Sequence, residues 1–136
     1  MAQYKKGKAT RLSNNFKSTE FDCKCGKNCG DTLIDAYLVV ILQRIRNHFA
    51  RPVIINSGYR CIAHNKAVGG SKSSRHTRGQ AADIVVKGVS PRKVAQYAES
   101  IGVLGIGLYD TFTHIDTRQN KYYWYSHDEK RMRTFK

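Results

Sequence analysis

The sequence contains no long apolar run, which excludes a conventional membrane-spanning helix. Its longest apolar run, residues 36–42, is far shorter than the ~20 residues that a helix needs to cross a bilayer. The basic segment at residues 1–11 also lacks the apolar stretch of a secretory signal. We therefore expect no membrane span, and synthesis in the cytoplasm without a signal peptide.

Acidic residues are scarce: 10 Asp and Glu stand against 24 Lys and Arg, which gives a formal net charge of +14. Such a charge attracts polyanions, with nucleic acid, anionic cell-wall polymers and lipid head groups as alternatives. The basic residues are spread along the chain, and no nucleic-acid-binding motif accompanies them. We therefore expect no specific nucleic acid partner, although the charge alone also fits simple solvation.

Internal repeats and low-complexity segments are absent, so the 136 residues are most simply one domain. We expect a flexible or loosely docked basic leader over residues 1–14, a single domain over residues 15–136, and a monomer.

Only four cysteines are present: Cys23, Cys25, Cys29 and Cys61. The first three are too close in sequence to form a pair of disulfides among themselves, but with Cys61 two bridges are open in any of three connectivities. A second, structural metal ion is an alternative, although C-x-C-x3-C is not a standard zinc motif. Without an export signal, the sequence favours reduced thiols or metal over disulfides.

The order of apolar patterns predicts an α+β fold with helices packed on one face of a largely antiparallel sheet. Asp31 is the predicted N-cap of a helix whose apolar residues run from Ile34 to Phe49 at helical spacing. Ser90-Pro91 opens a second helix through about Ile101. Strands are predicted at these segments: 53–57, 80–87, 104–109, 112–117 and 122–125, the last three as an antiparallel meander.

Two imidazoles and one carboxylate form the strongest chemical pattern. His76 lies in a polar, glycine-flanked loop, whereas Asp83 lies within the apolar strand segment 81–86 and needs a cation or several donors there. Together with His114 they supply the nitrogen and oxygen ligands of a catalytic zinc site that leaves a position for water. This predicts metal-assisted hydrolysis.

Asp116 is two residues beyond His114, so both side chains fall on one face of a strand. It could orient an imidazole, act as a general base, or simply pair with Arg118. Asp110, in the preceding turn, is the competing candidate for the base.

The string Ser74-x-His76-x-x-Gly79-x-Ala81-x-Asp83 resembles the zinc D-Ala-D-Ala carboxypeptidase family and its related peptidoglycan endopeptidases. The resemblance covers about residues 15–125 and continues through these segments: Ser57-Gly58-Tyr59-Arg60, Asn65, Gly69-Gly70, residues 105–109 and His114-Ile115-Asp116. It implies a Hedgehog-like or D-Ala-D-Ala-peptidase-like fold, one catalytic zinc ion held by His76, Asp83 and His114, and cleavage of peptide bonds in peptidoglycan.

Many relatives carry an acidic base three residues before the last ligand, where this chain has Thr111. We therefore name Asp116 ahead of Asp110 as the base. Arg60 is expected to stabilise the developing oxyanion or hold a substrate carboxylate, with a structural ion pair as its alternative. Ser74 and Tyr109 join it as substrate-binding candidates, although Ser74 could equally hold the His76 loop.

The composition and the resemblance together suggest a phage or prophage lysin that reaches the cell wall with a holin-like, membrane-permeabilising partner. The alternative is a non-catalytic, zinc-containing wall-binding module of the same fold, since Hedgehog-type domains carry a similar ligand pattern. Near the end of the chain, the aromatic run 122–125 either lines a groove or covers the sheet. The basic tail 130–136 either favours an anionic wall or is a solvated end.

Overall fold

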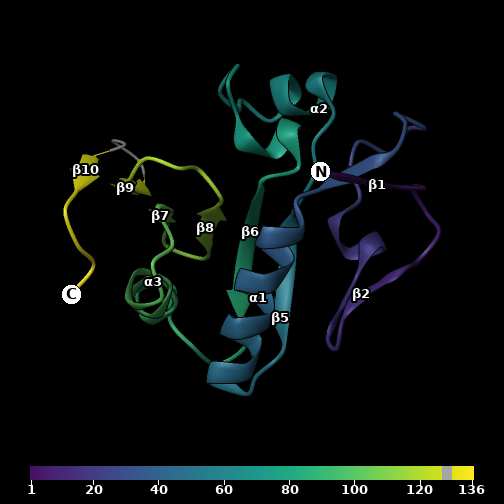
Figure 1. The fold of residues 1–136 in the computed structure, drawn as a ribbon. Helices are drawn as coiled ribbons and strands as arrows, with labels where there is room; N and C mark the ends of the chain where they lie inside the picture. Colours follow the sequence, from purple (N-terminus) through teal and green to yellow (C-terminus); the bar gives the residue numbers. More distant parts are fainter. Residues whose placement is uncertain (127–129) are drawn as a thin grey trace.

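The computed structural model describes residues 1–126 and 130–136. Its centre is a six-stranded sheet with the strand order β10-β9-β7-β8-β6-β5. Its strands are β5 (Val53–Ser57), β6 (Ala81–Val86), β7 (Gly105–Leu108), β8 (Thr113–Asp116), β9 (Tyr122–Tyr125) and β10 (Lys130–Met132). Two smaller antiparallel pairs lie beside it (Figure 1): β1 (Ala2–Tyr4) with β4 (Thr32–Ile34), and β2 (Arg11–Ser13) with β3 (Phe16–Lys17).

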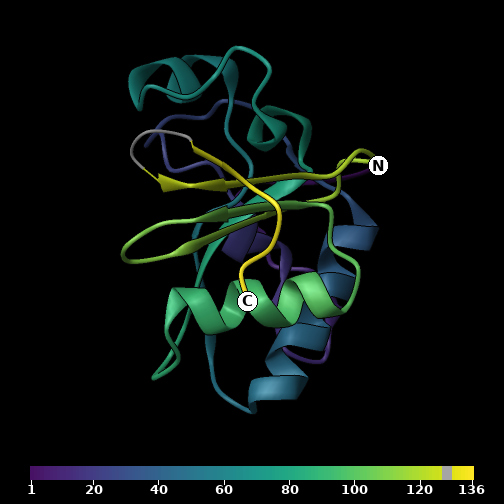
Figure 2. The same cartoon turned by 90° about the vertical axis from the view of Figure 1, so that its left-hand side faces the viewer.

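Helices α1 (Ala36–Phe49) and α3 (Pro91–Ser100) cover one face of the sheet, as Figure 2 shows. The short helix α2 (Ile62–Ala67) and the 3-10 turn η2 (Arg75–Arg78) lie on the other side, and a further 3-10 turn, η1 (Ser18–Phe21), follows β3. The predicted α+β class is therefore confirmed. Within the described ranges, no helix is both long and apolar enough to span a membrane.

The first helix begins later than predicted. Residues 32–34 pair with β1 as strand β4, and Asp35 rather than Asp31 caps α1, where its carboxylate accepts a hydrogen bond from the Tyr37 backbone N–H at 2.9 Å. The error arises because Asp35 is as good a capping residue as Asp31, and propensity does not choose between them. Ser90 caps α3 as predicted.

The C-terminal strands also depart from the prediction. Strands β7 and β8 form the predicted antiparallel hairpin, but β9 crosses over and pairs in parallel with β7. The tail that follows is not a solvated end, since β10 pairs with β9 and Phe135 is completely buried. Phe135 packs in the core, and its backbone N–H donates to Oε1 of Glu99 at 2.8 Å, so both contacts hold this segment to the domain.

The N-terminal segment, where we expected a flexible or loosely docked leader over residues 1–14, pairs with two other strands. Residues 2–4 pair with β4 and residues 11–13 with β3. Tyr4 and Leu12 pack against the hydrophobic core and supply the reason for this docking.

Alternation along the strands separates the core from the site. On β6 and β8, Ala82, Ile84 and Ile115 are buried in the core beneath the helices. The intervening residues face the other way, and the register places Asp83 opposite His114, with Gly107 of β7 next in the same row. The sheet therefore carries two of the predicted ligands side by side.

Candidate active site

His76, Asp83 and His114 converge, as the sequence predicted. Oδ1 of Asp83 lies 3.2 Å from Nε2 of His76 and 3.0 Å from Nδ1 of His114. All three residues are buried, and one potential ligand atom from each lies within 4.8 Å of the others. In a tetrahedral site with ~2.0–2.1 Å bonds, ligand atoms are about 3.3 Å apart, so these separations suit a single ion.

The remaining nitrogen of each imidazole is held by an acceptor. Nδ1–H of His76 donates to the backbone carbonyl of Gly58 at 2.8 Å, and Nε2–H of His114 donates to Oδ2 of Asp116 at 2.8 Å. Each hydrogen bond fixes the tautomer and turns the free lone pair toward Asp83. The two nitrogen lone pairs and the Asp83 oxygen then face the same point. These electron-rich atoms repel one another unless a cation or a proton lies between them.

The pKa shifts follow from this arrangement. Burial disfavours the charged form of Asp83, but the polar contacts with His114 and His76 outweigh it and hold the pKa of Asp83 below its usual range. Burial likewise opposes ionisation of His114, yet Asp116 and Asp83 raise its pKa to about 9. Both shifts show that the surroundings of Asp83 favour positive charge.

Arg60 forms a structural ion pair in this site. Its guanidinium donates to Oδ2 of Asp83 at 3.2 Å, to Ser57 Oγ at 2.9 Å and to Asn65 Oδ1 at 3.2 Å. These contacts leave Oδ1 of Asp83 as the oxygen directed at the histidines. They match the alternative considered for Arg60, and its role in oxyanion or substrate binding stays a prediction.

Asp116 lies behind His114, on the side of the ring away from Asp83. Its carboxylate is fully buried and accepts two hydrogen bonds from the Arg118 guanidinium, at 2.8 and 2.7 Å, besides the one from His114. Burial opposes ionisation, but His114 and Arg118 hold the pKa of Asp116 below its usual range. These contacts favour the orienting role over the general base, which stays a prediction.

The other predicted residues occupy distinct places. Ser74 caps η2, where its hydroxyl accepts a hydrogen bond from the His76 backbone N–H at 3.2 Å, and Tyr109 stacks on Phe112. Both line the cleft described below. Asp110 and Thr111 are exposed in the turn between β7 and β8, and neither contributes to the lining of that cleft.

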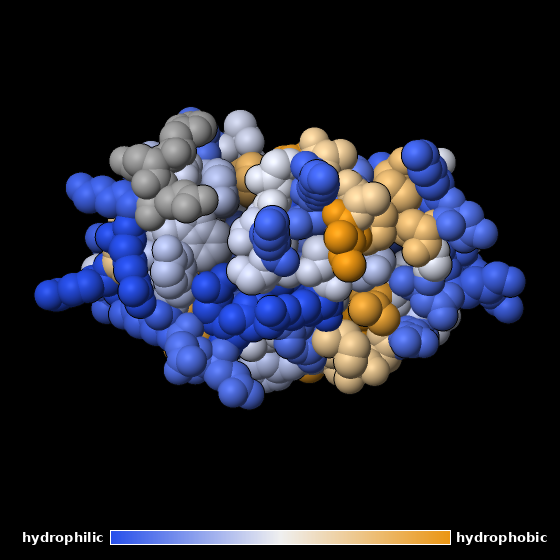
Figure 3. Space-filling view, turned by 90° about the horizontal axis from the view of Figure 1, so that it is seen from above, coloured by the Kyte–Doolittle hydropathy of each residue, from blue (hydrophilic) through white to orange (hydrophobic). Residues whose placement is uncertain are grey.

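A cleft of about 480 Å³ opens over the three converging residues. Aromatic side chains form one wall, where Trp124 donates a hydrogen bond from Nε1 to the Tyr109 hydroxyl at 2.9 Å. Four arginines line the cleft, Arg60, Arg75, Arg78 and Arg118, whereas Asp83 is its only carboxylate among the described residues. The cleft therefore favours anionic ligands. The surface at the α2 end of the molecule is largely hydrophilic with small apolar patches (Figure 3).

Two glycines of β7 make room for this site, a function that the sequence analysis did not assign. A Cβ atom at Gly105 would meet the Asp116 carboxylate, and one at Gly107 would meet the Trp124 ring. The detectable signal is a Gly-x-Gly alternation within a strand, which indicates close approach of bulky neighbours on one face. The role of the Gly58 carbonyl as the acceptor for His76 was not predicted either, because the pattern of side chains in a sequence does not indicate which backbone carbonyl accepts a hydrogen bond.

Replacement of Gly105 by Ala should therefore weaken metal binding, because the new methyl group displaces the Asp116 carboxylate that orients His114. We expect a loss of up to ~10-fold in metal affinity, the low end for supporting residues, measured by competition with a chromogenic chelator. Gly107→Ala is the matched variant, which should disturb Trp124 and substrate affinity instead. Equal metal affinities in Gly105→Ala and the wild type would contradict the role of Asp116.

The four cysteines also come together, with sulfur atoms within 4.8 Å of one another. The structure contains no disulfide among them. None of the four cysteines lines the cleft.

Comparisons with known proteins agree with the geometry. A family model described as Peptidase M15 matches residues 14–116, a range that includes all three converging residues. The peptidoglycan L,D-endopeptidase MepK of Escherichia coli strain K12 is 38% identical over 74 residues, which cover 49% of this chain and 41% of that protein. The protein of the same name from Shigella flexneri matches with the same identity and coverage. This chain thus matches less than half the length of these relatives.

Proposed function

Because the chain belongs to the Peptidase M15 family, we propose that it is a zinc-dependent peptidase that hydrolyses a peptide bond in peptidoglycan. The observation that carries the proposal is the convergence of His76, Asp83 and His114 at the floor of an arginine-lined cleft. The name of the relatives supplies the substrate class.

The charge of the cleft supports this substrate. Peptidoglycan stem peptides carry free carboxylates, and Arg75 and Arg78 line the cleft beside the candidate metal site. A neighbouring hollow of about 770 Å³ shares Arg75, Arg118 and Tyr122 with the cleft. A binding region that continues past the candidate metal site suits an endopeptidase, because an endopeptidase binds substrate residues on both sides of the cleaved bond.

Zinc held by His76 Nε2, Asp83 and His114 Nδ1 would act as a Lewis acid and make water nucleophilic near neutral pH. The chain's own residues prepare for this. Asp116 keeps the proton of His114 on Nε2 at 2.8 Å, and the Gly58 carbonyl does the same for Nδ1 of His76. Arg60 fixes the Asp83 carboxylate by its 3.2 Å ion pair. Trp124 and Tyr109 form a wall against which a substrate packs.

The test is mass spectrometry of purified peptidoglycan after incubation with the protein, with and without a zinc chelator. We expect new fragments that disappear with chelator, and their masses identify the bond. Two fragments from within a cross-linked peptide indicate an endopeptidase, whereas loss of one terminal D-alanine indicates a carboxypeptidase. Intact peptidoglycan from several wall types, after incubation with protein shown to contain zinc, would refute the proposal and favour a wall-binding module.

We also propose that the protein acts at the bacterial wall as a phage or prophage lysin, after release by a membrane-permeabilising partner. The support is its net charge of +14, which suits anionic wall polymers. Co-expression with a holin should lyse cells, and co-expression of the His76→Ala variant should not. Lysis by that variant would contradict a role that depends on hydrolysis.

A further inference from the structure

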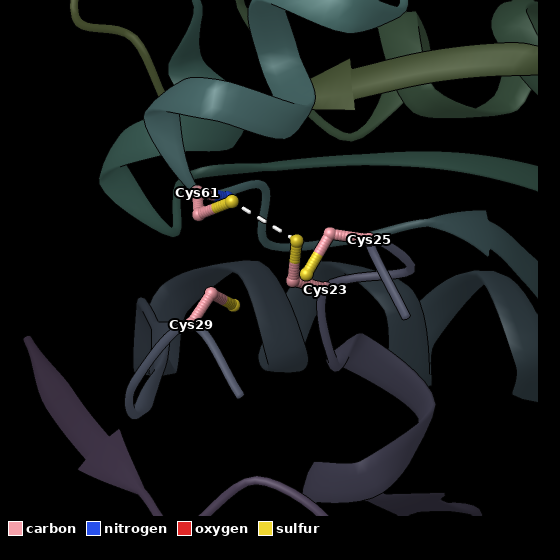
Figure 4. A group of neighbouring side chains, drawn as sticks. All are labelled: Cys23, Cys25, Cys29 and Cys61. Atoms are coloured by element: carbon pink, nitrogen blue, oxygen red, sulfur yellow. Dashed lines mark hydrogen bonds between the residues drawn. The ribbon is translucent and has the colours of Figure 1, made fainter. Parts of the chain in front are cut away.

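The cluster of Cys23, Cys25, Cys29 and Cys61 lies outside the cleft, and the proposed hydrolysis does not use it. Figure 4 shows the four side chains pointing into a shared space from two separate segments. Three come from the loop between η1 and β4, and Cys61 caps α2 on the far side. The first and last of them are 38 positions apart, so the fold rather than local sequence brings the set together.

The sulfur positions suit one ion better than disulfides. All four sulfur atoms lie within 4.8 Å of one another. Four thiolates around zinc, at bonds of ~2.3 Å, are about 3.8 Å from each other, so a small contraction of the cluster closes a tetrahedron. Disulfides would instead divide the cluster into two pairs, and the structure shows no S–S bond.

Hydrogen-bond donors surround the sulfurs as they do in metal–thiolate sites. Backbone N–H groups donate to three of them: Cys61 to Cys23 Sγ at 3.3 Å, Lys27 to Cys25 Sγ at 3.3 Å, and His64 to Cys61 Sγ at 3.4 Å. The Lys6 ammonium reaches the sulfurs of Cys25 and Cys29, at 3.5 and 3.6 Å. Four thiolates and one divalent ion carry two negative charges, which Lys6 offsets in part.

From this geometry we infer that the four cysteines bind a structural zinc ion, distinct from the proposed catalytic one. Zinc accepts a closed set of four thiolates with tetrahedral geometry, and such a site leaves no position for substrate. The position of this ion next to residues that contact the candidate active site suits a structural role. Cys61 directly follows Arg60, which contacts Asp83, and the Gly58 carbonyl holds His76.

The ion would fasten this turn to the N-terminal part of the chain. The turn already makes a backbone hydrogen bond from Tyr59 to the Phe21 carbonyl at 2.8 Å, and Arg60 N–H donates to the His76 carbonyl at 3.1 Å. An ion bound by Cys61 and by Cys23, Cys25 and Cys29 would join these two segments through residues that do not line the cleft. The cysteine site thus supports the ligands of the cleft without touching them.

The experiment measures metal content in the presence of an intact and a disabled catalytic site. Inductively coupled plasma mass spectrometry should find one zinc per chain in the His76→Ala variant, and two in the wild type. The Cys25→Ser/Cys29→Ser double variant should lose the tightly held thiolate-bound zinc, and keep the one in the cleft. Cobalt added to metal-free His76→Ala protein should give the intense visible bands of tetrahedral cobalt–thiolate. Absence of zinc and of these bands would overturn the inference.

The number of reactive thiols in the wild-type protein distinguishes a metal site from disulfides. This measurement does not require a cysteine variant that folds. Wild-type protein denatured in chelator without reductant should react with alkylating reagent at all four cysteines, whereas the native protein should be protected. Fewer than four reactive thiols after denaturation would show disulfides and overturn the site. None of these readouts requires peptidoglycan cleavage, so failure of the proposed activity would leave them interpretable.

Discussion

Replacement of His76 or Asp83 by Ala is expected to abolish hydrolysis. The same variants should also lose the metal ion that we propose for this site. Each change removes one of the three proposed ligands, and the two that remain do not make a complete zinc site. Lewis-acid catalysis contributes several kcal/mol, so we expect a rate loss of more than about a hundredfold, measured as product formation from peptidoglycan alongside metal content.

The matched control is His48→Ala, because His48 is exposed on α1 and stacks on Tyr97, away from the cleft. This variant should keep its catalytic metal and its rate. Wild-type hydrolysis by either ligand variant would show that the three converging residues are not the catalytic centre.

Replacement of Asp116 by Ala is expected to weaken zinc binding by about 10–100-fold, the range for residues that orient a metal-ligating histidine. The change removes the acceptor 2.8 Å from His114 Nε2 and leaves Arg118 without its buried partner. Asp116→Asn should bind zinc with intermediate affinity, since the amide oxygen can still accept the hydrogen bond. Calorimetric titration of metal-free protein measures both.

The kinetic pattern separates this orienting role from general-base catalysis. With a positioning role, saturating zinc should restore most of kcat in Asp116→Asn. With a general-base role, kcat should stay low at full zinc occupancy while metal affinity is unchanged. The second result would reinstate Asp116 as the base, against the geometry that places its carboxylate behind the His114 ring.

The convergence of His76, Asp83 and His114 was predictable because it depends on local chemistry and strand periodicity. An ionisable residue inside the apolar segment 81–86 required a cation or donors, and the period of two in a strand placed Asp83 on the face away from the core. The helices at 36–49 and 91–100 followed from apolar spacing, apart from the choice between Asp31 and Asp35 as a cap.

The features of the fold that could not be predicted from the sequence depend on contacts between distant segments. The parallel pairing of β9 with β7 and the docking of residues 2–4 on β4 are set by tertiary packing, which local propensity does not encode. Whether Asp116 faces the metal position or the back of His114 depends on side-chain rotamers. The sequence left open how Cys61 combines with the three earlier cysteines, and the fold brings all four sulfur atoms together.

The most direct test of the account is peptidoglycan hydrolysis by chelator-stripped protein as zinc is added back. We expect no hydrolysis at the start, and a rate that rises with zinc until the site of His76, Asp83 and His114 is filled. The His76→Ala variant should gain nothing from the same additions. Full hydrolysis by stripped wild-type protein, shown by mass spectrometry to be free of metal, would contradict the account.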